Sequence, residues 1–351
     1  MTQQAVVEVE GAQAPSTRHV SLTFSDGATR EITVADGQNV LAAAKEQGIA
    51  LASQCEVGTC CTCAAFVTSG TATMPSNLVT ALTADEMAAG QRLLCQTYAG
   101  TDAAFEIEYP SSLLDANPAV RFAAKVSRVT WVAESVVELE VKVPKALKFG
   151  FTAGQYCRIR VPGTDEWRSY SMASGEHERT RLTFLIRVLP TGLMSDFLRD
   201  EARAGVALDL EGPLGGFALE PSERPHILMA GGTGLAPMLS MLDRLRLVRP
   251  TPPILLIFGC VREADLFLLD ELAARASFIP TLRVRVALEQ DSGLSGVVPG
   301  NPVSVLSPDD ILGDSIAYLC GPPGMIHAAE DRLAQLGLAH ADIRAEQFLP
   351  S

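Results

Sequence analysis

The sequence predicts a chain of three domains, in which an α+β unit is followed by an antiparallel β-barrel and then by a doubly wound α/β unit. The first observation is a strand–strand–helix pattern leading into a cysteine-rich loop within residues 17–110. The second is a series of strand patterns separated by turn residues over residues 119–222. The third is a repetition of strand and helix over residues 223–351, which indicates a parallel sheet.

Length, composition and charge exclude several classes of protein. The 351 residues suffice for two or three domains, and the hydrophobic content of 47% lets each bury a core. The net charge of −13 argues against nucleic-acid binding and suits docking to a basic protein partner, although it also serves solubility. No run reaches the roughly 18 apolar residues of a transmembrane helix, so no membrane association is expected.

Cysteine usage and the N-terminus indicate the compartment. Residues 1–14 lack the apolar core of a signal peptide. Cys157, Cys260 and Cys320 are scattered singly, which points to a reducing environment. We therefore expect a cytoplasmic protein.

The first domain is expected to follow a loose tail at residues 1–16. Alternating apolar and polar residues predict its strands, and Gly48 is expected to end its first helix. Residues 111–118 are rich in turn formers and predict a linker to the second domain. The expected elements are strands at 19–24 and 29–34, a helix at 40–46, a strand at 64–67, a helix at 84–89 and a strand at 104–109.

The loop of the first domain carries Cys55, Cys60 and Cys63 at C-x4-C-x2-C spacing, and a remote Cys95 follows. This spacing is typical of plant-type ferredoxins, in which four thiolates hold a [2Fe–2S] cluster. Gly58 suits such a loop, since the backbone must approach the cluster closely. The order of elements around the loop is also that of a plant-type ferredoxin.

Two other readings of these cysteines are weighed against the cluster. A four-cysteine zinc site usually shows two C-x2–4-C pairs, and only one is present. A disulfide framework suits a short secreted chain rather than one of this length. Cys61 is an additional thiol in the loop, and we expect it to pack as a small residue rather than to bind metal.

The second domain contains five strand patterns that predict a small barrel, and three motifs that suit a bound flavin. Arg168 and Tyr170 share one face of a strand, so the aromatic ring can support a flavin while the cation binds its diphosphate. At Gly192 a loop opens a short helix, whose N-terminus is an anion site. A glycine-rich turn follows at 212–217. An ordinary strand pair and simple turns are the alternatives. The predicted strands are 122–132, 136–143, 155–161, 182–188 and 207–211.

The third domain begins with a strand at 226–230, a glycine-rich turn and a helix at 238–247. This is a dinucleotide-type βα unit, although Pro237 replaces the last small residue of the usual motif. Further βα units are predicted at 254–274 and 316–336, with helices at 264–274 and 325–336. The repetition predicts a doubly wound parallel sheet.

Two residues follow the later strands of this sheet. Asp265 can accept hydrogen bonds from ribose hydroxyls and repel a 2′-phosphate, which favours NADH. It could equally be a helix N-cap, and nearby Arg262 favours NADPH instead. Cys320 ends a strand where a ligand can reach it, although a buried core cysteine is the alternative.

From residue 17 onwards the chain resembles the iron–sulfur flavoprotein reductases of bacterial oxygenases, above all the reductase component of benzoate-type aromatic-ring-hydroxylating dioxygenases. The residues that carry the resemblance are Cys55, Cys60, Cys63, Cys95, Arg168, Ser169, Tyr170, Ser171, Gly192, Leu193, Met194, Ser195, Gly212, Pro213, Leu214, Gly215, Gly231, Gly232, Thr233, Gly234, Cys320, Gly321, Pro322, Pro323, Glu346, Gln347 and Phe348. The chain departs from the usual family pattern at three positions, Glu56, Cys61 and Gly324.

The resemblance implies a plant-type ferredoxin β-grasp domain, an FAD-binding barrel and an NAD-binding domain. FAD would lie against Arg168, Ser169, Tyr170 and Ser171, with Gly192, Met194 and Ser195 near its phosphates. The pyridine nucleotide would be held by Gly231, Gly232, Thr233, Gly234 and Gly321, in addition to Asp265 proposed above from its position. Cys320, Ser171 and Glu346 would position the reacting groups, and Phe348 would cover a flavin face.

The activity implied by the resemblance is stepwise electron transfer. A hydride passes from NADH to FAD, and single electrons then pass through the cluster to a terminal oxygenase, expected to be of Rieske type. A monomer is expected. The alternatives are the reductase of a diiron phenol or methane monooxygenase or of a sugar dehydrase, a redox carrier without nucleotide turnover, and a structural zinc module fused to an oxidoreductase.

Overall fold

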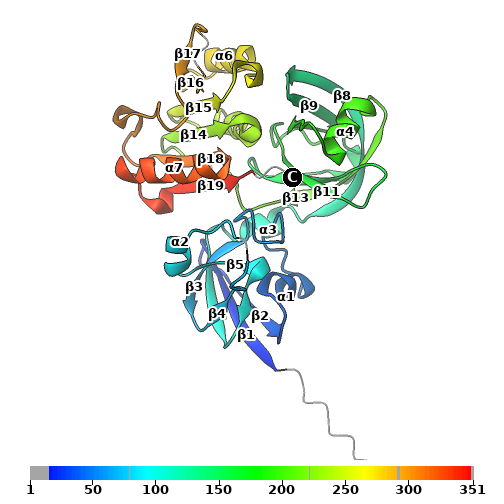
Figure 1. The fold of residues 1–351 in the computed structure, drawn as a ribbon, viewed down its shortest axis with the longest axis vertical. Helices are drawn as coiled ribbons and strands as arrows, with labels where there is room; N and C mark the ends of the chain where they lie inside the picture. The colour runs from blue at the N-terminus through cyan, green and yellow to red at the C-terminus, as the bar shows by residue number, and fades with distance from the viewer. Residues whose placement is uncertain (1–15, 79, 221, 291–292, 349–351) are drawn as a thin grey trace, which may run out of the picture.

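The computed structural model describes residues 16–78, 80–220, 222–290 and 293–348, which form three successive lobes (Figure 1). The expected N-terminal tail lies outside the described residues apart from Ser16. The three lobes are the α+β unit, the barrel and the doubly wound unit in the predicted order, so the predicted fold class is confirmed.

The first lobe is a β-grasp sheet of five strands in the order β2-β1-β7-β3-β5. Strands β1 and β7 are parallel, and the hairpin of β1 and β2 is antiparallel as predicted. Alternation along β1 buries Val20, Leu22 and Phe24 on one face, against the helix α1, whose N-cap Asn39 accepts a hydrogen bond from the Ala42 N–H. The strands are β1 (Thr17–Phe24), β2 (Thr29–Ala35), β3 (Ala64–Ser69), β5 (Gln91–Leu93) and β7 (Ala103–Ile107), with β4 (Ala72–Thr73) paired to β6 (Tyr98–Ala99), and the helices are α1 (Val40–Glu46), α2 (Ala84–Ala88) and η1 (Leu94–Gln96).

The segment predicted as a linker contains a short helix, α3 (Ser112–Ala116), which its turn-rich composition did not indicate. The helix forms because it buries Leu113. Ser111 also donates a hydrogen bond to Asp26 over 2.8 Å, which ties the segment to the first lobe. Figure 1 shows α3 at the junction between the first lobe and the barrel.

The second lobe is a six-stranded antiparallel sheet in the order β11-β10-β13-β8-β9-β12. A bridge between Met172 and Phe184 links the two edges, which closes the sheet into a barrel. The helix α4 (Leu193–Asp200) packs Met194, Phe197 and Leu198 into the barrel core. The strands are β8 (Val120–Ala133), β9 (Val136–Lys142), β10 (Tyr156–Arg160), β11 (Trp167–Ser171), β12 (Arg181–Arg187) and β13 (Ala207–Leu214), with a short helix η2 (Lys145–Leu147).

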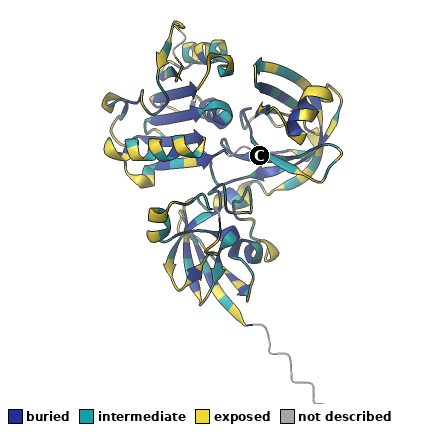
Figure 2. Ribbon diagram, in the orientation of Figure 1, coloured by how far each residue is buried: buried dark blue, intermediate teal, exposed yellow. Residues whose placement is uncertain are grey.

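The third lobe is a six-stranded parallel sheet in the order β17-β16-β15-β14-β18-β19. Strands β14, β15 and β18 are almost wholly buried (Figure 2), because helices cover both faces of the sheet. The strands are β14 (His226–Gly231), β15 (Ile254–Cys260), β16 (Leu282–Leu288), β17 (Val297–Pro299), β18 (Ile316–Gly321) and β19 (Ile343–Gln347), and the α-helices are α5 (Leu235–Leu245), α6 (Leu269–Phe278) and α7 (Pro323–Gln335). Short helical turns are η3 (Gly232–Gly234), η4 (Glu263–Asp265), η5 (Pro308–Asp310) and η6 (His340–Asp342).

The second helix of this lobe was predicted too early in the chain. We expected it at 264–274, whereas α6 begins at Leu269. The preceding residues form the separate turn η4, and Leu268 adopts a left-handed conformation with φ of 56°. Asp265 is therefore not the N-cap of α6, which was one of its two expected roles.

Within the described residues, no helix is both long and apolar enough to span a bilayer.

Candidate functional site

Pairing between β3 and β5 assembles the four cysteines. Cys55, Cys60 and Cys63 lie on the loop between α1 and β3, and Cys95 lies in η1 directly after β5. Antiparallel pairing sets Ala64 opposite Leu93, and the Leu94 N–H donates to the Cys63 carbonyl over 3.0 Å. The last cysteine of the loop therefore lies beside the remote one.

The loop backbone directs N–H groups at its sulfur atoms. The N–H groups of Val57 and Thr59 donate to Cys55 Sγ over 3.4 and 3.2 Å. The Cys55 N–H donates to Cys60 Sγ over 3.4 Å. Gly58 has the expected positive φ of 90°, and a Cβ there would lie 3.1 Å from Gln96 Cγ. Donors aimed at sulfur favour thiolates, which are the form that binds iron.

The four thiols interact as two pairs. A hydrogen bond from Cys60 lowers the pKa of Cys55 to about 4, and one from Cys63 lowers the pKa of Cys95. Among the described residues, no group of three or more His, Cys, Asp or Glu side chains converges as a single metal ion requires. Two pairs of thiols fit a cluster that places two protein sulfurs on each of two irons.

Cys61 lies apart from these pairs. Its side chain packs against the core of the first lobe, and burial raises the pKa of its thiol to about 12. This contact with the core accords with the expectation that Cys61 packs as a small residue, and its role stays a prediction.

The expected flavin site lies on strand β11, at an edge of the barrel sheet. Arg168 and Tyr170 share a face of this strand, and the Arg168 guanidinium donates to Glu166 over 3.0 Å. Its side chain is partly exposed, so it can exchange this weak surface partner for a diphosphate. Ser169 lies between them, opposite Arg158 on β10.

The phosphate site expected from the sequence would lie at the N-terminus of α4. Gly192 precedes the helix with φ of 139°, a conformation that glycine tolerates far better than other residues. The Ser195 hydroxyl accepts a hydrogen bond from the Leu189 N–H over 2.9 Å, which leaves its own O–H available to donate. Met194 is buried in the barrel core, so its side chain anchors the helix rather than presenting itself to a ligand.

The glycine-rich turn after β14 packs directly on β18. A Cβ on Gly234 would overlap the Cys320 carbonyl oxygen, and one on Gly231 would lie 2.8 Å from Met325 Sδ. Gly232 has a positive φ of 55°, and Thr233 completes the turn η3. The absence of side chains brings the start of α5 close to the end of β18, at the carboxyl edge of the sheet where α/β proteins bind nucleotides.

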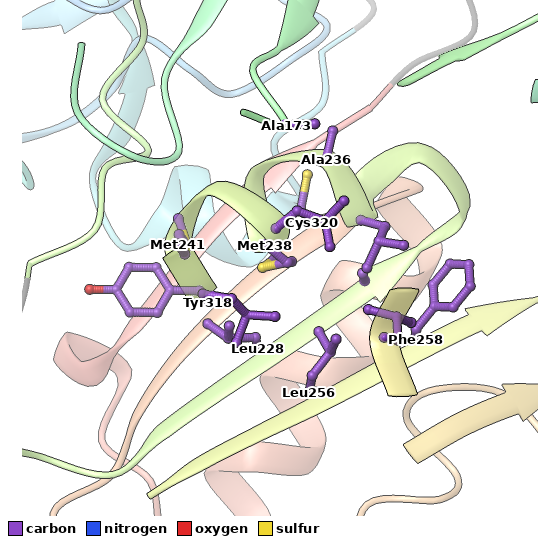
Figure 3. Packing of buried hydrophobic residues seen from close by; sticks show 14 of the residues in the cluster. Ala173, Leu228, Ala236, Met238, Met241, Leu256, Phe258, Tyr318 and Cys320 are labelled. Atoms are coloured by element: carbon purple, nitrogen blue, oxygen red, sulfur yellow. The ribbon is translucent and has the colours of Figure 1, made fainter. Parts of the chain in front are cut away.

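Cys320, Ser171 and Glu346 come together although they are far apart in the sequence. Parallel pairing of β18 and β19 sets Cys320 opposite Glu346. Ser171 Oγ donates to Glu346 Oε2 over 3.1 Å, which joins the barrel to the third lobe. Cys320 is fully buried in the same core cluster as Ala173 and Ala236 (Figure 3).

Glu346 supplies the carboxyl of this group, and its pKa is strongly perturbed. Burial raises its pKa to about 8, and the Ser171 hydrogen bond only partly opposes this. Its Oε1 atom is buried without a hydrogen-bond partner. An unsatisfied carboxyl oxygen between the flavin strand and the nucleotide turn fits a site that a polar ligand group completes.

The C-terminal residues lie over the same region. The Phe348 N–H donates to the Gly321 carbonyl over 2.8 Å, and the Phe348 side chain packs against the core that contains Cys320. Figure 1 shows the end of β19 pointing at the barrel. Phe348 therefore lies close to Cys320 and Gly321, and its role as a cover for the flavin stays a prediction.

Asp265 is already engaged by two neighbours. Arg262 donates to it through two nitrogens at 2.9 and 2.8 Å, and Ser135 Oγ donates over 2.7 Å. The Arg262 hydrogen bond lowers the pKa of the carboxyl. Ser135 lies in the β8–β9 turn, so this contact joins the barrel to the third lobe, and a ribose hydroxyl would have to share the carboxylate with both donors.

Residues whose importance depends on long-range contacts were not found from the sequence. Ser135 gave no local signal, because a turn serine is common. Met325 contacts both Gly231 and Gly321, and its place after two prolines at the start of α7 was the only available clue. Tyr156 was not singled out either, although it starts β10 and reaches the cysteine loop.

Family comparisons identify each lobe. Residues 23–100 match the 2Fe-2S iron-sulfur cluster binding domain family, residues 123–219 the oxidoreductase FAD-binding domain family and residues 228–331 the oxidoreductase NAD-binding domain family. These three domains define an iron–sulfur flavoprotein reductase, an oxidoreductase of the ferredoxin reductase type whose cofactors are a [2Fe–2S] cluster, FAD and a nicotinamide nucleotide.

The whole chain aligns with curated relatives. It is 36% identical over 341 residues to the anthranilate 1,2-dioxygenase electron transfer component of Acinetobacter baylyi, covering 95% of this chain and 97% of that protein. It is 35% identical to the toluate 1,2-dioxygenase electron transfer component of Pseudomonas putida, covering 95% and 99%. The chain therefore belongs to the family of iron–sulfur flavoprotein electron transfer components of bacterial oxygenases.

A solved structure shows the same arrangement of domains. The cytochrome P450 reductase of Amycolatopsis superposes with a TM-score of 0.72 and 28% identity, covering 94% of this chain and 99% of that one. The likeness thus extends over all three lobes rather than one domain.

Proposed function

We propose that the chain transfers electrons from NADH, through FAD and the [2Fe–2S] cluster, to a Rieske-type terminal oxygenase that hydroxylates an aromatic ring. The main support is the alignment over 95% of the chain with the electron transfer component of anthranilate 1,2-dioxygenase. The four paired cysteines and the Ser171–Glu346 contact supply the two ends of such a route in this chain.

The barrel residues are proposed to hold FAD. Arg168 binds the diphosphate, Tyr170 supports the ring, and Gly192 and Ser195 offer donors at the start of α4. When bound, FAD accepts a hydride from the nicotinamide and gives up single electrons, which the cluster carries onward. The role of the protein is to hold and orient the cofactors, which carry out the electron transfer themselves.

At the nucleotide site, Cys320 and Glu346 are proposed to position the nicotinamide. Both lie at the carboxyl ends of neighbouring strands, and Ser171 links them to the flavin strand. With its pKa raised to about 8, Glu346 is mostly protonated at pH 7, so it can donate a hydrogen bond there without adding charge. Phe348 keeps water from this region while the nicotinamide is absent.

NADH rather than NADPH is proposed as the donor. Asp265 carries a negative charge, since Arg262 holds its pKa low, and this charge disfavours a 2′-phosphate. Arg262 is turned towards Asp265 by two hydrogen bonds, which reduces its availability for a phosphate.

A monomer in the cytoplasm is the proposed state of the protein. None of the eight cysteines, all of which lie within the described residues, forms a disulfide, which is typical of a reducing compartment.

Reconstitution tests the proposal. The purified protein should contain about two irons and two sulfides per chain together with FAD, and should reduce cytochrome c with NADH. Addition of a Rieske-type dioxygenase should give NADH-dependent product. Failure with the Rieske enzyme but turnover with a diiron hydroxylase would favour the second candidate, since the methane monooxygenase component C of Methylosinus trichosporium is 36% identical over 73% of this chain.

A further inference from the structure

A buried tyrosine connects the barrel to the cysteine loop. Tyr156 opens β10 and is completely buried. Its backbone pairs with Ser171 on β11, the residue that donates to Glu346. Its hydroxyl donates a hydrogen bond to the Ser53 carbonyl, two residues before Cys55. One side chain thus spans from the flavin strand to the entry of the cluster loop.

A second tyrosine holds the same entry segment from within the first lobe. The Tyr109 hydroxyl accepts a hydrogen bond from the Ala52 N–H over 2.8 Å. Two tyrosines therefore hold the backbone of two consecutive residues, one at the Ala52 N–H and the other at the Ser53 carbonyl. Tyr109 belongs to the domain that carries the loop, whereas Tyr156 belongs to the barrel.

Gly215 and Gly216 leave space for these two rings because they lack side chains. A Cβ on Gly215 would lie 2.9 Å from two ring carbons of Tyr156. A Cβ on Gly216 would lie 2.6 Å from a ring carbon of Tyr109. The glycine-rich turn therefore accepts both tyrosines against its backbone, which gives these two glycines a purpose besides that of making a turn.

The buried Tyr156 side chain lies close to Glu346. Burial raises the pKa of its hydroxyl, and negative charge on Glu346 and Cys60 adds to this rise. Glu346 Oε1 also lies 3.9 Å from the Cβ position of Gly215, on which the Tyr156 ring packs. The tyrosine thus occupies the protein between the proposed flavin site and the iron site.

We propose that Tyr156 is a positioning residue for electron transfer, which holds the cluster loop against the flavin strand through its hydrogen bond to the Ser53 carbonyl. This role rests on the electron route proposed above. One electron leaves the flavin and one enters the cluster, while Tyr156 itself is neither oxidised nor deprotonated. The tyrosine keeps the cluster loop ordered and close to the flavin strand. This matters because electron transfer requires the two cofactors to stay close.

Tyr156→Phe tests the proposal by removing only the hydroxyl. In stopped-flow mixing of the holoprotein with NADH, flavin reduction should keep its rate, and the following reduction of the cluster should slow severalfold. Hydrogen exchange on the full-length chain gives a readout independent of turnover. The amides of residues 52–55 should exchange about fivefold faster in the variant, the factor by which the loss of one net hydrogen bond changes an opening equilibrium.

Tyr318→Phe is the matched control. This tyrosine is also fully buried, and its hydroxyl accepts a hydrogen bond from the Glu220 N–H over 3.0 Å, away from the loop. The Tyr318→Phe variant should change neither the rate of cluster reduction nor the hydrogen exchange of residues 52–55. Gly215→Ala provides a second variant, because its added Cβ displaces the Tyr156 ring while the hydroxyl is retained, and it should slow the same phase.

Three results would overturn the role of Tyr156. One is a Tyr156→Phe holoprotein whose rate of cluster reduction and amide hydrogen exchange both equal those of the wild type. Another is an equal slowing of flavin reduction and cluster reduction, which would place the residue in the flavin site. The third is an equal effect of the Tyr318 control. A wild-type chain that accepts no electrons from NADH would instead count against the proposed function, and the exchange measurement would still decide whether Tyr156 orders the loop.

Discussion

Replacing Glu346 with glutamine should remove a pH-dependent loss of stability. The Glu346 carboxyl is 4% exposed, and its hydrogen bond from Ser171 leaves Oε1 without a partner. Burial raises its pKa from 4.5 to about 8. Glutamine has almost the same shape but no charge at any pH, so the substitution separates the titration from the packing.

The direction of this pH dependence follows from the protons that Glu346 binds in the folded and unfolded chain. Between about pH 4.5 and pH 8, the unfolded chain has released the Glu346 proton and the folded chain still holds it. The free energy of unfolding therefore falls as the pH rises through this window, and this contribution levels off above it. At about 1.4 kcal/mol for each pKa unit, the full loss is on the order of 5 kcal/mol.

Urea unfolding followed by circular dichroism from about pH 5 to pH 9 would measure the effect. Glu346→Gln should resemble the wild type at the acid end and be more stable by several kcal/mol at the alkaline end, on the order of the loss worked out above. The exposed Glu263, changed to glutamine, is the control and should show no such divergence. If the difference between Glu346→Gln and wild type stayed constant across this range, the argument from burial would be wrong.

Three further predictions concern the cofactor sites. Cys95→Ala should abolish the visible absorption of the cluster and most of its roughly two irons per chain, whereas Cys61→Ser should retain both; an intact cluster in the alanine variant would refute the ligand set. Cys320→Ser should slow flavin reduction by NADH about tenfold with both cofactors still bound, and an unchanged rate would exclude contact with the nicotinamide. Gly234→Ala should weaken NADH binding about tenfold in a fluorescence titration, because its Cβ overlaps the Cys320 carbonyl oxygen; Gly324→Ala, where nothing lies within 4 Å, is the control.

Local patterns were sufficient for the cluster loop and for most elements. The cysteine spacing predicts a four-thiolate site because three ligands lie on nine consecutive residues, from Cys55 to Cys63. The alternation in β1 and the apolar runs in β14 and β18 likewise report burial directly. The start of α6 was misjudged, because the left-handed Leu268 interrupts a segment whose composition still favours a helix.

The three-domain order, the three cysteines of the loop and the glycine-rich turns were thus determined by the sequence alone, since each depends on residues close together in the chain. Only the tertiary structure decided which distant side chains meet. Ser171 and Glu346 are separated by 175 residues, and Tyr156 and Ser53 by 103. No local pattern encodes such contacts, because they arise only when separate domains pack and the entropy of closing long loops has been overcome.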